Sequence, residues 1–230
     1  QKIYSQQHCI VFKMNRLYSE RNFFILNSLY FSFVLFLLYK AVDMRYCLQC
    51  GCEAERKIPA TDNMPRLVCP NCHYIHYENP KVICGSLVVH KHRVLLCRRA
   101  IEPQYGLWTL PAGFMENGET MAEGAARESF EEADAVVINP HLYCLYDIPD
   151  IGQIYSIYVT ELKDGAYGIG SESLDCALFT EEDIPWDKLA FEAVRRTLKS
   201  YFADRQHYDS YDQFPIHQEI IGKDQAIKRY

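Results

Sequence analysis

The chain has 230 residues, 49% of them hydrophobic, which suffices for one core of ordinary size and a small additional module. The formal net charge of the whole chain is −6. Residues 1–43 hold five basic and two acidic side chains. Residues 44–230 therefore hold 19 basic and 28 acidic side chains, which gives them a net charge of −9. This acidic balance argues against a nucleic-acid-binding protein, which needs a basic face.

The first feature along the chain is an apolar run of 17 residues, 23–39, with Arg21 before it and Lys40 after it. The run is slightly short for a membrane span and contains polar interruptions, so a membrane anchor is one interpretation. No small-residue cleavage pattern follows it, which argues against a secretory signal. The chain does not begin with Met, whereas Met44 directly precedes the next module, so we expect residues 1–43 to lie outside the functional protein.

Four cysteines follow in two pairs, Cys47-x2-Cys50 and Cys69-x2-Cys72, separated by eighteen residues. Two such pairs ligate one Zn²⁺ tetrahedrally, so we predict a structural zinc ribbon over residues 44–78; two disulfides or four unconnected thiols are the alternative. Cys52 makes the register ambiguous, but Gly51 suits a tight turn after Cys50. The other six cysteines lack disulfide spacing, which indicates a reducing compartment, the cytoplasm.

Hydrophobic periodicity predicts one α/β domain over residues 79–204. The predicted strands are a hairpin of residues 82–90 and 93–99, followed by residues 142–148, 154–162 and 175–179. Apolar residues at helical spacing predict a helix over residues 189–202. The polar, tyrosine-rich residues 205–230 predict a mobile tail or a dimer-contacting arm.

A second predicted helix, opening at Met121 behind a Thr120/Glu123 capping box, carries three glutamates on about a third of its circumference. These are Glu128, Glu131 and Glu132. Like charges at this spacing repel, so the arrangement indicates a cation among them, although a solvated acidic face is the alternative. We expect the acidic arc to face a cleft or solvent and the opposite arc to pack on a sheet; that arc holds Ala122, Ala126, Ser129, Phe130 and Ala133.

The segment 106–114, Gly-Leu-Trp-Thr-Leu-Pro-Ala-Gly-Phe, and the segment 127–132, Arg-Glu-Ser-Phe-Glu-Glu, together resemble the Nudix hydrolase signature. Ser129 and Asp134 depart from that pattern, but Ser129 can bond back to a helix carbonyl and Asp134 tolerates a left-handed backbone. The resemblance implies an α/β (α+β) fold of the Nudix type, an α/β/α sandwich with a mixed sheet, here preceded by the zinc ribbon. It also implies hydrolysis of a nucleotide pyrophosphate bond.

The resemblance implies a role for each residue of the box. Glu128 and Glu132 are the expected direct ligands of Mg²⁺ or Mn²⁺, with Glu131 sharing a metal or a water and the Gly113 carbonyl completing the set. Arg127 is expected to orient these carboxylates and to pair with Glu119, which we place near the substrate. The catalytic base is a box glutamate or Glu172 from a later loop.

A zinc ribbon before the box is similar to two Nudix groups, the NADH pyrophosphatases and the ADP-ribose/FAD pyrophosphatases. The Ser-Gln-Pro-Trp-Pro-Phe-Pro array of the NADH group is missing, and Pro149 resembles a proline that marks ADP-ribose pyrophosphatases. We therefore expect cleavage of ADP-ribose or FAD to AMP plus the other phosphate, by a homodimer. NADH cleavage and a non-catalytic ribbon-based binding module are the alternatives. Tyr155 is the predicted contact for the substrate ring, with a core position as its alternative.

Overall fold

A computed structural model describes residues 46–222, which divide into two compact units between Tyr77 and Glu78. The predictions for residues 1–43, including a membrane anchor at residues 23–39, lie outside the described residues. Within residues 46–222, no helix has the length and apolar character needed to cross a membrane.

The smaller unit is an antiparallel sheet of three very short strands in the order β1 (Glu55–Lys57), β2 (Arg66–Val68) and β3 (Ile75–His76). Its buried apolar residues are Cys47, Val68 and Cys69. This buried apolar surface is too small to stabilise the unit by itself. The smaller unit therefore needs an additional cross-link.

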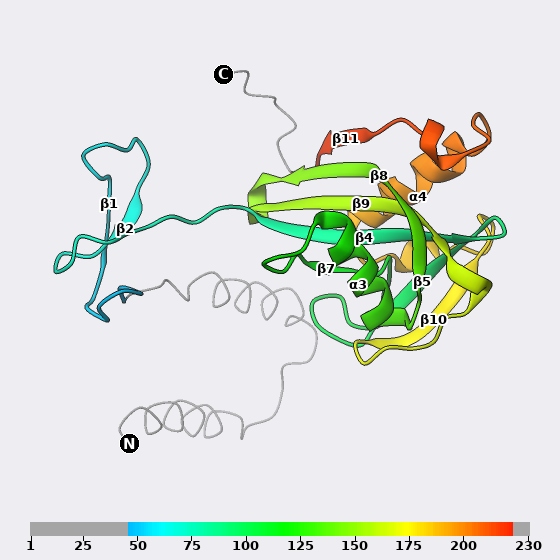
Figure 1. The fold of residues 1–230 in the computed structure, drawn as a ribbon, viewed down its shortest axis with the longest axis horizontal. Helices are drawn as coiled ribbons and strands as arrows, with labels where there is room; N and C mark the ends of the chain where they lie inside the picture. Colours follow the sequence, from blue (N-terminus) through cyan, green and yellow to red (C-terminus); the bar gives the residue numbers. More distant parts are fainter. Residues whose placement is uncertain (1–45, 223–230) are drawn as a thin grey trace, which may run out of the picture. The chain divides into compact units, whose positions relative to one another are not determined.

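The larger unit is built on a mixed sheet in the order β10-β5-β4-β9-β8-β11 (Figure 1). β4 pairs with β9 and β8 with β11 in parallel, and the other neighbours are antiparallel. The strands are β4 (Lys81–His90), β5 (Arg93–Arg99), β8 (Val137–Ile148), β9 (Gln153–Leu162), β10 (Ser173–Phe179) and β11 (His217–Ile220). Two short strands, β6 (Trp108–Thr109) on β5 and β7 (Ala112–Phe114) on β4, lead into the first helix of this unit.

Two helices, α3 (Met121–Ala133) and α4 (Glu192–Asp204), cover opposite faces of this sheet (Figure 1). The α4 face holds the larger core cluster, in which Leu198 and Phe202 pack against sheet residues such as Leu87. The α3 face holds a smaller cluster that includes Ala133 and Val88. Because residues of β4 alternate between the two clusters, the sheet is buried on both faces. The predicted α/β/α sandwich with a mixed sheet is confirmed.

The last helix begins later than its apolar periodicity predicts. Leu189 forms a parallel bridge with Trp108, and the Ala190 N–H donates to the Trp108 carbonyl at 2.8 Å. The residues before Glu192 therefore pair with a strand, and apolar spacing cannot separate such pairing from a first helical turn.

The prediction of a mobile tail after residue 204 is wrong for residues 217–220, which form β11 on the edge of the sheet. The Asp204 carboxylate accepts hydrogen bonds from the buried Tyr143 hydroxyl at 2.8 Å and pairs with His217 Nε2 at 2.7 Å. These contacts join α4, β8 and β11. They depend on partners distant in sequence, which is why local polarity alone suggested a tail.

We predict that Asp204→Ala lowers the free energy of unfolding by about 1 to 3 kcal/mol, because it leaves the buried Tyr143 hydroxyl without an acceptor. Urea denaturation measures the change, and the exposed Asp209→Ala is the matched control. Equal midpoints for the two variants would contradict the role assigned to Asp204.

Candidate active site

The ends of α3 are fixed as the sequence predicts. Thr120 Oγ1 accepts from the Glu123 N–H at 3.2 Å, and the Glu123 carboxylate accepts from the Thr120 N–H at 2.7 Å. At the other end Asp134 adopts φ +47°, and the Ser129 hydroxyl donates to the Ala125 carbonyl at 2.7 Å. Both departures from the signature are thus accommodated without breaking the helix.

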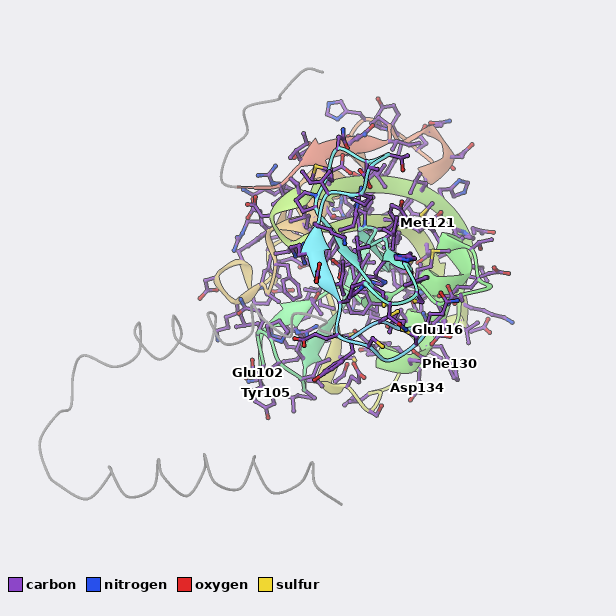
Figure 2. All side chains as sticks on the ribbon, turned by 90° about the vertical axis from the view of Figure 1, so that its left-hand side faces the viewer. Glu102, Tyr105, Glu116, Met121, Phe130 and Asp134 are labelled. Atoms are coloured by element: carbon purple, nitrogen blue, oxygen red, sulfur yellow. The ribbon has the colours of Figure 1, made fainter. Side chains whose placement is uncertain are left out.

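The three glutamates of α3 differ in burial. Glu128 and Glu132 are only 9% and 6% exposed, whereas the Glu131 side chain is 56% exposed. Phe130, predicted to pack on the sheet, is 55% exposed and lies at the outer edge of the larger unit (Figure 2). The prediction that the opposite arc packs on the sheet is therefore wrong for Phe130, and of the acidic arc, predicted to face a cleft or solvent, only Glu131 is open to solvent.

Burial and mutual repulsion perturb the two inner carboxyls. Burial, followed by the charge of Glu128, raises the pKa of Glu132 to about 8, although Arg99 opposes this effect. Burial also raises the pKa of Glu128, against the lowering effect of Arg127. Near neutral pH the residues present do not fully stabilise two carboxylates here, so the pair fits a divalent cation with oxygen ligands.

Arg127 holds the acidic cluster together. Its guanidinium donates two hydrogen bonds to the Glu119 carboxylate, at 2.9 and 3.1 Å, and this pairing holds the pKa of Glu119 down at about 2. The same group donates to Glu128 at 2.7 Å and to Glu131 at 2.9 Å. It also donates to the Phe114 carbonyl at 3.0 Å, which fixes the loop before α3 to the helix. The predicted pairing of Arg127 with Glu119 is present.

Gly113 lies in β7, where its main chain contacts the Glu128 side chain. A Cβ atom at Gly113 would overlap the Glu128 carboxylate, so a larger residue there would displace it. The structure therefore brings together Gly113 and Glu128, two of the predicted metal-binding residues.

The loop formed by residues 166–172 brings Glu172 to the same cluster. The Gly170 N–H donates to the Glu132 carbonyl at 2.9 Å, and a Cβ atom at Gly170 would overlap the main chain of Glu131. The charge of Glu172 contributes to raising the pKa of both Glu128 and Glu132, so its exposed carboxylate lies close to them. Glu172 and the box glutamates thus stay the candidates for the base.

The sequence did not point to Arg99 at the end of β5. Arg99 is the cation that opposes the raised pKa of Glu132, and its Nε donates to the Pro103 carbonyl at 2.9 Å. An arginine at a strand end is common, so composition and spacing gave no signal for it.

Tyr155 has the core position that was the alternative interpretation, although the charge of Arg99 acts on it as well as on Glu132. It is partly buried and packs against the larger core cluster together with its strand neighbours Ile157 and Val159. That cluster lies on the α4 face, opposite α3, as expected from the alternation of side chains along β9.

In the smaller unit, the thiols of Cys47, Cys50, Cys69 and Cys72 lie within 4.8 Å of one another. Their closest sulfur pairs are 3.5 Å apart, too far for a disulfide, and every cysteine within residues 46–222 is a free thiol. The Cys52 backbone N–H, followed by the Cys69 and Asn71 side chains, lowers the pKa of the Cys50 thiol to about 6. Four convergent thiols without a disulfide fit a tetrahedral zinc site, with Cys50 rather than Cys52 as the ligand.

Two family models match the chain. Residues 45–78 match the zinc-ribbon model described as Nudix N-terminal, and residues 80–201 match the NUDIX domain. A crystal structure of a NUDIX hydrolase from Nitrosomonas europaea is 48% identical, with a TM-score of 0.74, and covers 78% of this chain and 100% of that chain.

Two kinds of curated relative are similar to the chain. The ADP-ribose pyrophosphatase of Methanocaldococcus jannaschii is 30% identical over 132 residues, which are 56% of this chain and 76% of that protein. The NAD-capped RNA hydrolase NudC of Vibrio vulnificus is 31% identical over 167 residues, 68% of this chain and 62% of that protein. The match to NudC of Haemophilus influenzae spans only 35% of that relative's length.

We predict that the metal-free protein loses stability as pH rises from about 4.5 to about 8. The folded state keeps a proton on Glu132 up to its pKa of about 8, whereas the unfolded state releases it near the ordinary value of 4.5, so the folded state binds more protons in this window. The slope from this group is at most about 1.4 kcal/mol per pH unit.

Thermal melts in chelator, compared with Glu132→Gln, isolate this contribution, and added Mg²⁺ should restore stability at high pH. Identical pH slopes for the wild type and Glu132→Gln in chelator would show that Glu132 does not titrate in this way.

The thiol cluster predicts one Zn²⁺ per chain, lost in Cys69→Ser and retained in Cys52→Ser, because Cys52 lies outside the ligand set. Elemental analysis of protein purified without chelator measures both. Zinc loss in Cys52→Ser but not in Cys69→Ser would reverse the assignment.

Proposed function

The chain belongs to the Nudix hydrolase family, and we propose that it is a metal-dependent pyrophosphatase that cleaves ADP-ribose or FAD. The observation that supports this proposal most is the burial of Glu128 and Glu132 side by side, with Arg127 bonded to the first and Gly113 against it. Such a pair is costly to bury, and a bound divalent cation removes the cost.

Glu128, Glu132 and the Gly113 main chain would hold Mg²⁺ or Mn²⁺, and the exposed Glu131 would share a metal or a bound water. When bound, such cations neutralise pyrophosphate oxygens and lower the pKa of coordinated water. Oxygen ligands and the absence of His or Cys from this set favour hard cations.

The remaining steps belong to the chain's own residues. Glu172 accepts a proton from the attacking water, whose oxygen bonds to one phosphorus atom while the bond from that phosphorus to the bridging oxygen breaks. The bridging oxygen leaves with the electron pair on the other phosphate, and Arg99, whose charge acts on Glu132, would offset the developing charge there. The products are AMP and the other phosphate.

Phe114 is a better candidate than Tyr155 for holding a substrate ring. Its ring is 52% exposed, its carbonyl is fixed by Arg127, and the Lys81 ammonium lies 5.2 Å from the ring centroid. An exposed ring next to Gly113 offers a flat contact at the end of the metal site.

The substrate preference rests on sequence and on relatives. The array typical of the NADH group is missing, and the Methanocaldococcus jannaschii relative is named an ADP-ribose pyrophosphatase. NADH or an NAD-capped RNA end is the second candidate, because the NudC match covers more of this chain. Free thiols throughout residues 46–222 support a reducing compartment such as the cytoplasm, and homodimerisation remains a proposal.

We predict that Glu128→Gln and Glu172→Gln each lower kcat at least 100-fold, for different reasons. Loss of a metal ligand should also raise the Mg²⁺ concentration needed for half-maximal rate, whereas loss of the base should not. The assay is hydrolysis of ADP-ribose, FAD and NADH by the full chain, with the exposed Glu116→Gln as control. Near-wild-type turnover of Glu128→Gln at saturating Mg²⁺ would refute the proposed site.

A further inference from the structure

Two buried cysteines, Cys97 of β5 and Cys176 of β10, lie directly opposite each other in the sheet. The two strands are antiparallel neighbours (Figure 1), and Cys176 pairs with Cys97 within an unbroken ladder of residues 175–179 on residues 94–98. Both side chains belong to the core cluster on the α3 face, so they point to the same side of the sheet. Among the paired strands of residues 46–222, no other two cysteines are register partners.

The spacing of this pair suits a disulfide. Directly opposite residues of antiparallel strands have Cα atoms about 4.5 to 5.5 Å apart, and a disulfide spans Cα separations of about 4.4 to 6.8 Å. Both thiols are free, and a hydrogen bond between them is the largest influence on either pKa, lowering that of Cys176 and raising that of Cys97. The two sulfur atoms can therefore be bridged without a large movement of the backbone.

Cys176 is the member of the pair that a small oxidant reaches first. β10 is the last strand in the order of the sheet, so its outer edge has no partner among the strands of residues 46–222. Cys176 keeps 7% of its surface exposed, against 1% for Cys97. An edge strand opens locally at a lower free-energy cost than a central strand, which gives the oxidant a route to the thiol.

The cysteine pair also contacts the last turn of α3. Ala133 belongs to the same core cluster, and Cys176 Sγ donates to the Glu132 carbonyl at 3.4 Å. The Gly170 N–H donates to the same carbonyl at 2.9 Å. A disulfide sulfur has no hydrogen to donate, so oxidation removes one of these two donors. The main chain of Glu132 is thus held differently in the oxidised and the reduced protein.

We propose that Cys97 and Cys176 form a redox-sensitive pair, which a hydroperoxide oxidises to a disulfide that weakens metal binding at Glu132. The effect on metal binding rests on the proposed function. Disulfides of this transient kind are the ones found in reducing compartments.

The chemistry of the pair needs only the hydroperoxide as a co-reactant. The Cys176 thiol attacks one peroxide oxygen and becomes a sulfenic acid, while the O–O bond breaks and the other oxygen leaves as water or an alcohol. The Cys97 thiol then attacks the Cys176 sulfur, the S–S bond forms, and the sulfenic oxygen leaves as water. In total the two thiols lose two electrons and two protons, and the hydroperoxide is reduced. A dithiol reductant reverses the step.

The test treats the reduced full chain with hydrogen peroxide, removes the peroxide, blocks free thiols and maps disulfides by peptide mass. Cys97→Ala and Cys176→Ser each remove the pair, and the serine keeps a hydrogen donor for the Glu132 carbonyl. Cys144→Ala, a buried cysteine of β8 whose register partners are not cysteines, is the matched control. We expect the Cys97–Cys176 peptide pair in the wild type and in Cys144→Ala, and its loss on addition of dithiothreitol.

Metal affinity is measured on the same samples from the paramagnetic resonance signal of free Mn²⁺. Because one hydrogen bond to the main chain of Glu132 is lost, we expect Mn²⁺ to bind about threefold more weakly to the oxidised wild type than to the reduced wild type. Cys97→Ala and Cys176→Ser should bind Mn²⁺ equally before and after peroxide, although they keep the thiols of the ribbon.

These measurements separate the redox pair from the proposed activity. The expected disulfide and the weaker Mn²⁺ binding would support the pair even if the wild type hydrolysed neither ADP-ribose, FAD nor NADH, a result that would refute only the proposed activity. Absence of the Cys97–Cys176 disulfide after peroxide, or equal Mn²⁺ affinity of the oxidised and reduced wild type, would overturn the proposed switch, whatever the rate of hydrolysis.

Discussion

The burial of Glu128 and Glu132 one turn apart on α3 is the constraint on which the rest of the larger unit depends. Two carboxylates removed from water repel each other, and the folded chain must offset this cost. Arg127 and Arg99 supply positive charge to the two carboxylates. They do not supply enough to return the pKa of Glu132 to its ordinary range, and a bound cation would offset this residual imbalance.

The same constraint explains why the surrounding backbone approaches α3 so closely. Gly113 contacts the Glu128 carboxylate, and Gly170 contacts the main chain of Glu131, with no room for a Cβ atom at either position. A third glycine, Gly124 in α3, lies where a Cβ atom would meet Cys84 of β4 at 3.2 Å. Gly113 thus sets main chain rather than water against the Glu128 carboxylate, while Gly170 and Gly124 let neighbouring segments pack closely on α3.

Structural features that depend on the spacing of residues close in the sequence were predictable. Features that depend on contacts between residues far apart in the sequence were not. The cysteine pairs and the capping box at Thr120 depend on residues close in sequence, so their patterns were sufficient. The exposure of Phe130 depends on how α3 is rotated against the sheet, and β11 depends on contacts with Tyr143 in β8. Tyr155 shows the same limit, because a tyrosine in a strand can face either side until the register is known.

The residues proposed to carry out hydrolysis differ in exposure from the residue proposed to contact the substrate ring. Glu128 and Glu132 are buried and Glu128 is bonded to Arg127, so under the proposed function substitutions there alter the chemistry itself. Phe114 is exposed, and it is held by its carbonyl on Arg127 and by the Lys81 ammonium near its ring. A change of the exposed Phe114 ring removes none of the acidic side chains, so under the proposed function substrate preference can change without loss of the hydrolytic centre. Relatives named for different nucleotide substrates are consistent with this separation, because the box residues can stay constant while the exposed loops differ.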